Sequence, residues 1–468
     1  MLLLGSILGR RLRRAPFFFV SVVAVTALAG ESNNVAGTLP EDYFPELKTI
    51  LQTAIKQAPQ VLLREIEIAQ QEARILGADA QRLPSLGGDI RYGSIETAVS
   101  GRASAQTRDR GLFYSVALNQ ALFHWGAIKH GSDIARIRVA IAEKNYVEAY
   151  RALVRDLRRQ YVGLVARKSG LRYARHTLGL REAELKIARE KLSSGTISPG
   201  EVGGRQLNLD EDRLRLDRAE AEFAAERRRF GRLAGIGDIT EEAIPGEMAK
   251  PAYSPALASS LLAGLLRAGG KSNFEVQVAE LHLREADLGY RIANVRLRPK
   301  FNATAAYSLQ NSTYATPVSV TQTGIAQQTI EVNARWSIFD GFASRGAKLE
   351  ALTDKRYWQR RLQIASETVL DEAQQLERMI ALDARAMEFS EIRRAGAEEG
   401  VRRAEEEVKR GNAPQTHIDA ATGDLRLGEY NNALARAAFL SDWSSFVSLA
   451  GDDPALNSLP ARYVREKQ

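Results

Sequence analysis

The sequence predicts a mostly α-helical fold, built from two copies of one long-helix unit with four β strands inserted. Two observations lead to this prediction: an internal duplication with an offset of 216 residues, and leucines that recur every seven residues over a long stretch. The composition agrees, because 7% of the residues are aromatic and 26% are charged. This mixture is typical of long, solvent-flanked helices and not of a compact enzyme core.

The duplication is visible as an ordered series of matching residues. Pro84 and Tyr92 recur 215 residues later as Pro299 and Tyr307. At the offset of 216, Phe123, Gly195, Leu209, Phe223 and Phe230 recur as Phe339, Gly411, Leu425, Phe439 and Phe446. One additional residue between positions 307 and 339 explains the change of offset. The chain therefore consists of two repeats.

The N-terminus has the features of a secretion signal. Four arginines between positions 10 and 14 precede an apolar run at 17–28, and Ala27-Leu28-Ala29 supplies the small residues of a cleavage site. A membrane-anchor helix is the alternative, but the run is shorter than the roughly 20 residues that span a bilayer. We expect residues 1–29 to be a signal peptide. No later segment is apolar for long enough to form a membrane helix, so any membrane crossing of the mature chain requires strands.

Both repeats have the same order of elements. A helix at 59–83 or 274–298 ends at a proline, and two alternating segments, a very long helix, a glycine turn and a shorter helix follow. The linker between the repeats is rich in Gly and Pro and contains a short apolar helix at 256–267. The expected domains are an N-terminal segment at 30–58, the first repeat at 59–235, the linker at 236–272, the second repeat at 273–451 and a C-terminal tail at 452–468.

The long helices carry a sustained seven-residue pattern. In the first repeat it consists of Leu157, Leu164, Leu171, Leu178, Leu185 and Leu192. In the second it consists of Ala373, Ile380, Met387, Arg394, Val401 and Val408. Such a pattern indicates left-handed supercoiling against neighbouring helices, with an ordinary coiled coil as the alternative. A helix over 128–192 is about 100 Å long. The two shorter helices of a repeat together nearly equal the long one, so we expect them to stack along it as the wall of an α-barrel.

Four segments of about 10 residues alternate between apolar and polar side chains, as transmembrane strands do. The apolar positions in the second repeat are Phe301, Ala303, Ala305, Tyr307 and Leu309, then Ile330, Val332, Ala334, Trp336 and Ile338. Those in the first repeat are Ile90, Tyr92, Leu112, Tyr114, Val116 and Leu118. A half-buried soluble sheet shows the same alternation. Four strands cannot close a barrel in lipid, whereas three copies supply 12 strands for a trimeric β-barrel. The polar loops 97–110 and 311–329 are expected to face the outside.

The sequence gives no indication of catalysis or of a cofactor. Cysteine is absent, and the five histidines do not have metal-ligand spacing. Paired acids lie on helices with interspersed arginines, and Arg227-Arg228-Arg229 has glutamates nearby, as expected of a solvated helix face. We therefore predict that the protein is not an enzyme and binds no cofactor, metal or nucleic acid.

Several short motifs resemble those of the TolC family of outer-membrane efflux proteins. They are Leu83-Pro84-Ser85-Leu86, Leu122-Phe123-His124-Trp125-Gly126, and Ile338-Phe339-Asp340-Gly341, with Phe342 in place of the second residue of the usual glycine pair. Pro84, Pro299, Phe123, Phe339 and Gly341 thus mark helix–strand junctions. The resemblance implies a homotrimer with a 12-strand barrel in the outer membrane and a helical tunnel in the periplasm. It implies a passive duct of a tripartite efflux or type I secretion system, served by a periplasmic adaptor and an inner-membrane pump.

The resemblance also assigns the turns at the helical tips. Gly195 and Gly411 permit the turns, and the candidates for adaptor contact are Thr196, Ile197, Asn412 and Ala413. The acidic ring that narrows the entrance in familiar members is not matched. Its positions hold His417 and Ala420, with Asp419 beside them, and Glu201 lies at the equivalent place in the first repeat. Glu201, His417 and Asp419 are therefore the candidate pore-entrance residues, and His417 at the pore would titrate near neutral pH.

Two other classes of protein remain as alternatives. A periplasmic adaptor predicts one helical hairpin followed by many strands, whereas this chain has two hairpins and four convincing strands. A soluble, secreted coiled-coil scaffold predicts release without detergent.

Overall fold

The computed structural model describes residues 38–99, 105–315 and 320–459. The expected signal peptide at 1–29 and the end of the tail from residue 460 lie outside these ranges. The helices are α1 Pro40–Tyr43, α2 Pro45–Gln57, α3 Pro59–Ala80, α4 Ala127–Ser193, α5 Pro199–Ala234, α6 Pro255–Arg267, α7 Phe274–Asn294, α8 Ala343–Lys409, α9 Gln415–Ala450 and the 3₁₀ helix η1 Pro454–Ser458. The strands are β1 Ser85–Val99, β2 Ala105–Phe123, β3 Lys300–Ala315 and β4 Val320–Arg335.

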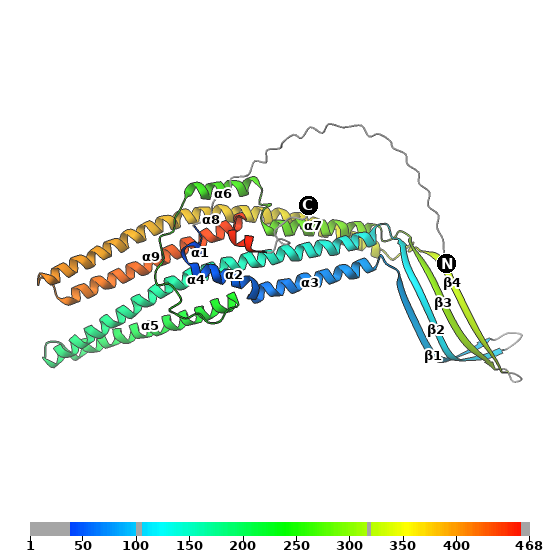
Figure 1. Cartoon of the computed structure of the whole chain (residues 1–468), viewed down its shortest axis with the longest axis horizontal. Helices are drawn as coiled ribbons and strands as arrows, with labels where there is room; N and C mark the ends of the chain where they lie inside the picture. Colours follow the sequence, from blue (N-terminus) through cyan, green and yellow to red (C-terminus); the bar gives the residue numbers. More distant parts are fainter. Residues whose placement is uncertain (1–37, 100–104, 316–319, 460–468) are drawn as a thin grey trace, which may run out of the picture. The chain divides into compact units, whose positions relative to one another are not determined.

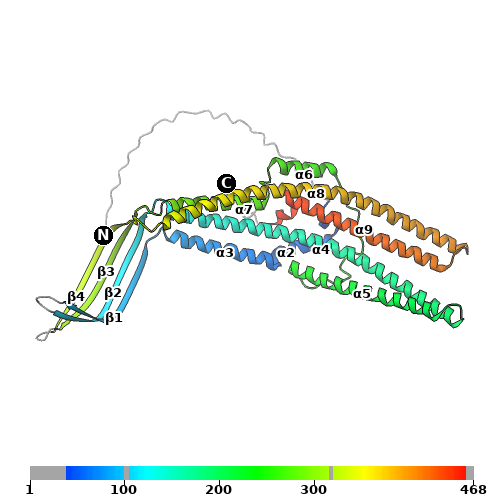
Figure 2. The ribbon, with the colours of Figure 1, turned by 180° about the vertical axis from the view of Figure 1, so that it is seen from behind.

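The helices confirm the duplicated long-helix architecture. The long helices α4 and α8 have 67 residues each, and α5 and α9 have 36 each. In each repeat the two shorter helices follow one another along the long helix, with the four strands at one end and the tip turns at the other (Figure 1 and Figure 2). Among the heptad leucines of α4, Leu157, Leu164, Leu171 and Leu185 are buried. The seven-residue pattern thus marks the packed face of the helix.

The two repeats share the same register between long and short helix. In the first repeat, Arg175 on α4 pairs with Glu220 on α5 at 2.9 Å. The positions 216 residues later hold Glu391 on α8 and Arg436 on α9, which pair at 2.5 Å. The charges are exchanged between the helices, but the pair is kept. The sequence offset is therefore also a structural equivalence.

The strands form one antiparallel sheet in the order β1-β2-β3-β4, so β2 and β3 pair the two repeats directly. The strands have 15 to 19 residues and are longer than predicted. The prediction of polar loops at 97–110 and 311–329 was wrong, because β1 and β2 pair out to Val99 and Ala105, and β3 and β4 pair out to Ala315 and Val320. Backbone pairing continues through these polar residues, which the apolar pattern does not reveal. The last alternating segment, predicted at 330–338, extends beyond the strand, because β4 ends at Arg335.

One face of the sheet is apolar, as the alternation predicts. Ile90 pairs with Tyr114, Val116 with Tyr307, and Ala305 with Ile330, which places these side chains on a common face. The opposite face carries polar partners such as Asn119 with Thr304 and Thr304 with Glu331. No described helix covers the apolar face (Figure 1), and Ile330 is 90% exposed. An exposed apolar face of this extent requires a partner surface.

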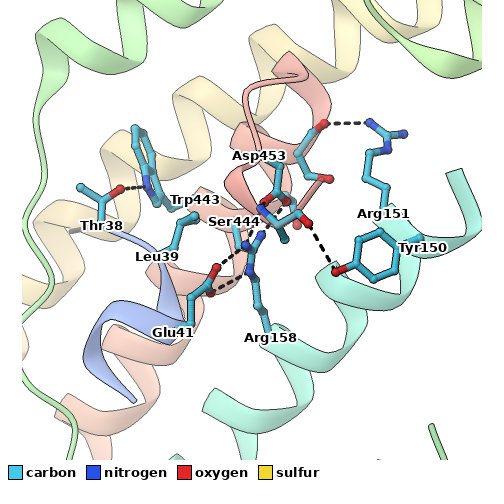
Figure 3. A network of polar contacts seen from close by, with 12 residues as sticks. Thr38, Leu39, Glu41, Tyr150, Arg151, Arg158, Trp443, Ser444 and Asp453 are labelled. Carbon is cyan, nitrogen blue, oxygen red and sulfur yellow. Dashed lines mark hydrogen bonds and ion pairs between the residues drawn. The ribbon is translucent and has the colours of Figure 1, made fainter. Parts of the chain in front are cut away.

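Both ends of the described chain are held at one buried arginine of α4. The Nε atom of Arg158 donates to Glu41 of α1 at 2.9 Å, and its Nη1 donates to Asp453 before η1 at 2.6 Å (Figure 3). Beside this group, Trp443 of α9 donates to the hydroxyl of Thr38 at 3.0 Å. Burial alone lowers the pKa of the guanidinium, but the two carboxylates outweigh it and hold the pKa above its usual value. The cluster fixes the N-terminal segment and the tail against the middle of the helical part.

None of the helices among the described residues combines the length and the apolar character that a membrane-spanning helix needs.

Candidate functional site

The first tip turn, between α4 and α5, reverses the chain through a left-handed glycine. Gly195 has φ 74°. Its N–H donates to the carbonyl of Leu192 at 2.9 Å, and the N–H of Thr196 donates to the carbonyl of Lys191 at 2.9 Å. This pair of bonds is the Schellman cap, which satisfies carbonyls that the end of α4 leaves free. Glycine is needed at this position because an L-residue with a Cβ is strained at positive φ.

The second tip turn, between α8 and α9, repeats this geometry. Gly411 also has φ 74°. Its N–H donates to the carbonyl of Val408 at 3.0 Å, and the N–H of Asn412 donates to the carbonyl of Glu407 at 2.9 Å. The two turns lie at the same end of the helical part (Figure 1). The structure therefore brings the two predicted tips to one end of the protomer.

The predicted contact residues of the tips differ in exposure. Thr196 and Asn412 are exposed, whereas Ile197 and Ala413 are half-buried. Thr196 is held by the hydroxyl of Ser194 at 2.9 Å. The exposed pair offers a hydroxyl and an amide to a partner, directly after the turns.

The candidate entrance residues lie on two different helices. His417, on the first turn of α9, is half exposed, and its Nε2 lies 3.3 Å from the Glu407 carboxylate near the end of α8. Asp419 is half-buried, and its carbonyl oxygen is 3.4 Å from Nε2 of His176 on α4. Glu201 is exposed on α5. His417 thus links the two sides of its own tip turn, and Asp419 belongs to the contact between the two repeats.

A pair of carboxyls in the second repeat was missed by the sequence analysis. In the first repeat, Arg167 on α4 and Glu226 on α5 form an ion pair of 2.7 Å. The equivalent residues are Asp383 on α8 and Asp442 on α9. Burial, together with the neighbouring Asp442 carboxyl, raises the pKa of Asp383 to about 6. The replacement of Arg by Asp at the 216-residue offset was the signal in the sequence that could have revealed this pair.

Each junction between a strand and a long helix contains two successive residues with positive φ. In the first repeat these are Trp125 at 56° and Gly126 at 81°. In the second repeat they are Gly341 at 62° and Phe342 at 69°. Each junction keeps one glycine and places an aromatic residue in a conformation that costs an L-residue about 1–2 kcal/mol. The Gly341 prediction is thus extended by Phe342, whose conformation the sequence did not indicate.

Trp125 connects the first junction to the second repeat. Its indole Nε1 donates to the carbonyl of Pro299 at 2.7 Å, and the guanidinium of Arg298 lies 4.8 Å from its ring centre. Beside it, Nε2 of His124 lies 2.9 Å from Oδ1 of Asn302 on β3. These contacts secure the point at which the repeats pass from helix to strand, and they explain why an aromatic residue occupies a left-handed position.

The second junction holds its aromatic residues outward. Phe339 is 72% exposed and Phe342 is 66% exposed, with ring centres 5.5 Å apart. Asp340 caps α8 by accepting from the backbone N–H of Ser344 at 2.9 Å. Trp125 of the first junction is therefore held within the chain, whereas the aromatic pair of the second junction is exposed.

Within the described part of the chain, no three His, Asp or Glu side chains converge as a metal site requires. The features that the structure does assemble are a two-faced sheet, a wall of long helices and two exposed tips.

These features agree with the comparisons to known proteins. Residues 50–235, which include the whole first repeat from α3 to α5, match the family profile described as outer membrane efflux protein. The second repeat copies these elements in the same order and register. Over residues 50–235 the chain is similar to the outer membrane efflux protein family.

Solved structures with the same fold are outer-membrane proteins. The Campylobacter jejuni CmeC outer membrane channel has a TM-score of 0.71 and 12% identity, and the match covers 95% of this chain and 94% of that one. The Vibrio cholerae outer membrane protein VceC has a TM-score of 0.66 and 14% identity, with 88% of this chain and 97% of that one covered. The Neisseria gonorrhoeae MtrE outer membrane channel has a TM-score of 0.60 and 13% identity, with 87% and 89% covered. No curated protein sequence is matched.

Proposed function

We propose that this chain is an outer membrane efflux protein, one protomer of a homotrimeric outer-membrane duct through which a tripartite export system passes its substrates. Channels of this family are passive ducts and not enzymes, and they work as trimers with periplasmic adaptors and inner-membrane pumps. The four strands belong in the outer membrane and the helical part in the periplasm. A periplasmic adaptor and a soluble scaffold are not favoured.

The observation that carries this proposal is the incomplete sheet. Its apolar face is exposed, and β1 and β4 each pair with only one neighbour among the described strands. Lipid does not tolerate unpaired backbone groups, so such a sheet is stable in a membrane only when its two edges are joined to other copies. Three copies joined edge to edge give the 12 strands of a closed barrel.

The tips are the proposed site of contact with the periplasmic adaptor. Thr196 and Asn412 follow equivalent turns at the end of the helical part away from the strands, and both are exposed. A periplasmic adaptor reaches the duct at this end. Glu201, His417 and Asp419 are proposed to lie near the periplasmic entrance, because they occupy the first turns after the tips.

The test is conductance in a planar bilayer. The mature protein should insert as a trimer and give stable, ion-conducting steps. The matched control is a variant with Ile330→Asp and Val332→Asp, which puts charges on the apolar face and should abolish insertion without altering the helical content. Absence of conductance from a folded wild-type trimer would contradict the duct.

A further inference from the structure

The two repeats differ in charge at the place where their strands meet the helices. In the second repeat, four basic residues flank the helical end of β3 and β4: Arg296, Arg298, Lys300 and Arg335. Their equivalents in the first repeat, 215 or 216 positions earlier, are all uncharged: Gln81, Leu83, Ser85 and Asn119. The first repeat has one cation of its own in this segment, Arg82, which is replaced by Leu297. The second junction therefore has four cations against one.

Two of these cations are placed directly against each other. Lys300 and Arg335 are opposite residues in the register of β3 and β4. Side chains at such positions are within reach of each other, and like charges there are destabilising. The equivalent pair, Ser85 and Asn119, is neutral, and the Ser85 hydroxyl donates to the carbonyl of Asn119 at 3.4 Å. The sheet forms without charge at this position in the first repeat, so the fold does not require the two cations.

Lys300 and Arg335 lie on the polar face of the sheet. Phe301 and Ala334, the next residue along each strand, form a pair on the apolar face, and successive side chains alternate between the faces. In a closed barrel with its apolar face toward lipid, the polar face lines the lumen. Three copies thus place six cations around the lumen, at the end where the strands join the helical part (Figure 1).

None of the four basic residues forms an ion pair with a carboxylate among the described residues. On the polar face of β3 and β4 the nearest acid is Glu331, whose Oε1 lies 3.4 Å from Nδ2 of Asn333. Glu331 is four residues from Arg335, or about 13 Å along the strand, which exceeds the Debye length of about 8 Å at physiological ionic strength. Farther along the described part of this face, Asp89 and Arg91 offset each other.

The other groups at this junction compensate the positive charge only in part. The Arg298 guanidinium lies 4.8 Å from the centre of the Trp125 ring, a contact that holds the side chain but keeps its charge. Arg296 is exposed. The Asp340 carboxylate is engaged in capping α8, where it accepts from the backbone N–H and the hydroxyl of Ser344. Cations that the fold does not require and does not pair indicate an anionic ligand.

We propose that the four residues form a cationic ring at the base of the barrel, which draws anionic solutes into the lumen and makes the duct prefer anions. The inference rests on the proposed trimeric duct and adds the class of its substrates, which are molecules with carboxylate, sulfate or phosphate groups. Rings of Lys and Arg select anions in pores, because a narrow lumen with walls of low dielectric constant focuses their field. Lys300 and Arg335 supply the charge in the lumen, and Arg296 and Arg298 add to it.

Ion selectivity in a planar bilayer of neutral phosphatidylcholine tests the ring. In a KCl gradient, the reversal potential of the wild type should give a chloride-to-potassium permeability ratio above unity. Lys300→Ser with Arg335→Asn, which introduces the residues of the first repeat, should lower this ratio at least about twofold. The preference should fade at about 1 M salt, where the Debye length is about 3 Å. The matched control is Lys48→Ser with Arg267→Asn, which removes the same charge from exposed positions of α2 and α6 and should leave the ratio unchanged.

Block by pyrophosphate gives a second readout. In about 0.1 M KCl, pyrophosphate added on the helical side should block the wild type at a concentration at least about tenfold lower than the double variant. Stable conductance with a ratio at or below unity, or with a ratio that the double variant does not change, would overturn the ring and leave the duct standing. Unchanged selectivity together with weaker binding to phosphatidylglycerol vesicles would assign the cations to lipid and also overturn the ring. Absence of conductance from the wild-type trimer would overturn both the duct and the ring.

Discussion

Asp383 on α8 lies against Asp442 on α9, at the place where the first repeat has the ion pair of Arg167 and Glu226. Two like charges therefore occupy a position that the fold uses for attraction elsewhere. Oδ2 of Asp383 is buried and has no hydrogen-bond donor among the described residues. A proton on Asp383 relieves both the burial of charge and the repulsion.

The acid pair predicts a stability that depends on pH. The pKa of Asp383 is raised from 3.8 to about 6 in the folded state, so the folded chain holds the proton more tightly than the unfolded chain. Its stabilising effect is complete below about pH 4 and is lost as the pH rises through 6. Asp383→Asn should thus stabilise the protein by roughly 1 kcal/mol at pH 7.5, after allowance for solvent screening, and by much less at pH 4.5.

Thermal unfolding at both pH values measures this difference. Asp371→Asn is the matched control, since Asp371 is exposed on the same helix. An equal effect of Asp383→Asn at both pH values would show that the pair does not share a proton.

Arg158→Ala is predicted to destabilise the protein by about 3–5 kcal/mol, because it leaves the carboxylates of Glu41 and Asp453 without their buried partner. Both ends of the described chain should also become more accessible to limited proteolysis. The control is Arg159→Ala, whose ion pair with Asp156 is exposed and worth less than about 1 kcal/mol. Equal losses from the two variants, measured by denaturant unfolding, would contradict the role of the cluster.

The left-handed junction predicts that alanine substitutions at two glycines five residues apart have opposite effects on the stability of the protein. Gly126→Ala should cost about 1–2 kcal/mol, because φ is 81° and the new Cβ would lie 3.3 Å from His130. Gly131→Ala, inside α4 with open space around it, should stabilise by about 0.5–1 kcal/mol. Denaturation midpoints give both values, and stabilisation by Gly126→Ala would refute the argument.

The tips are predicted to be the site of adaptor contact. A photo-cross-linker attached at Thr196→Cys or Asn412→Cys should capture a periplasmic protein in the native host. Gln81→Cys, exposed at the strand end of the helical part, should not. Capture from Gln81 alone would remove the tip assignment.

His417 is predicted to face the conduction path and to make the conductance depend on pH. Single-channel conductance of the wild type should vary between pH 5 and 8, and His417→Ala should flatten the profile. Glu407→Gln is the companion variant, since it removes the carboxylate 3.3 Å from the imidazole but keeps the histidine. An unchanged profile in His417→Ala would exclude the residue from the conduction path.

The sequence revealed most of the helical fold because heptad residues and repeat glycines have a single structural explanation. Leu157 and Gly195 are clear examples: the first is buried and the second turns the chain. The ends of the strands could not be found in this way. From Thr97 onward β1 has no apolar alternation that continues the pattern, and its pairing is made by backbone groups common to all sequences.

The candidate sites were only partly predictable. The glycines in the sequence predict the tip turns. The left-handed conformation of Phe342 and the facing carboxyls of Asp383 and Asp442 depend on neighbours that are distant along the chain, so the sequence does not reveal them. Comparison of the repeats with each other locates such positions, because a charge that changes at the 216-residue offset marks a place where the surroundings of the two repeats differ.

The native mass of the membrane-extracted protein tests the central claim most directly. Three protomers close the sheet, so mass photometry in detergent or nanodiscs should give three times the protomer mass. A monodisperse monomer in plain buffer, with no affinity for bilayers, would contradict the account.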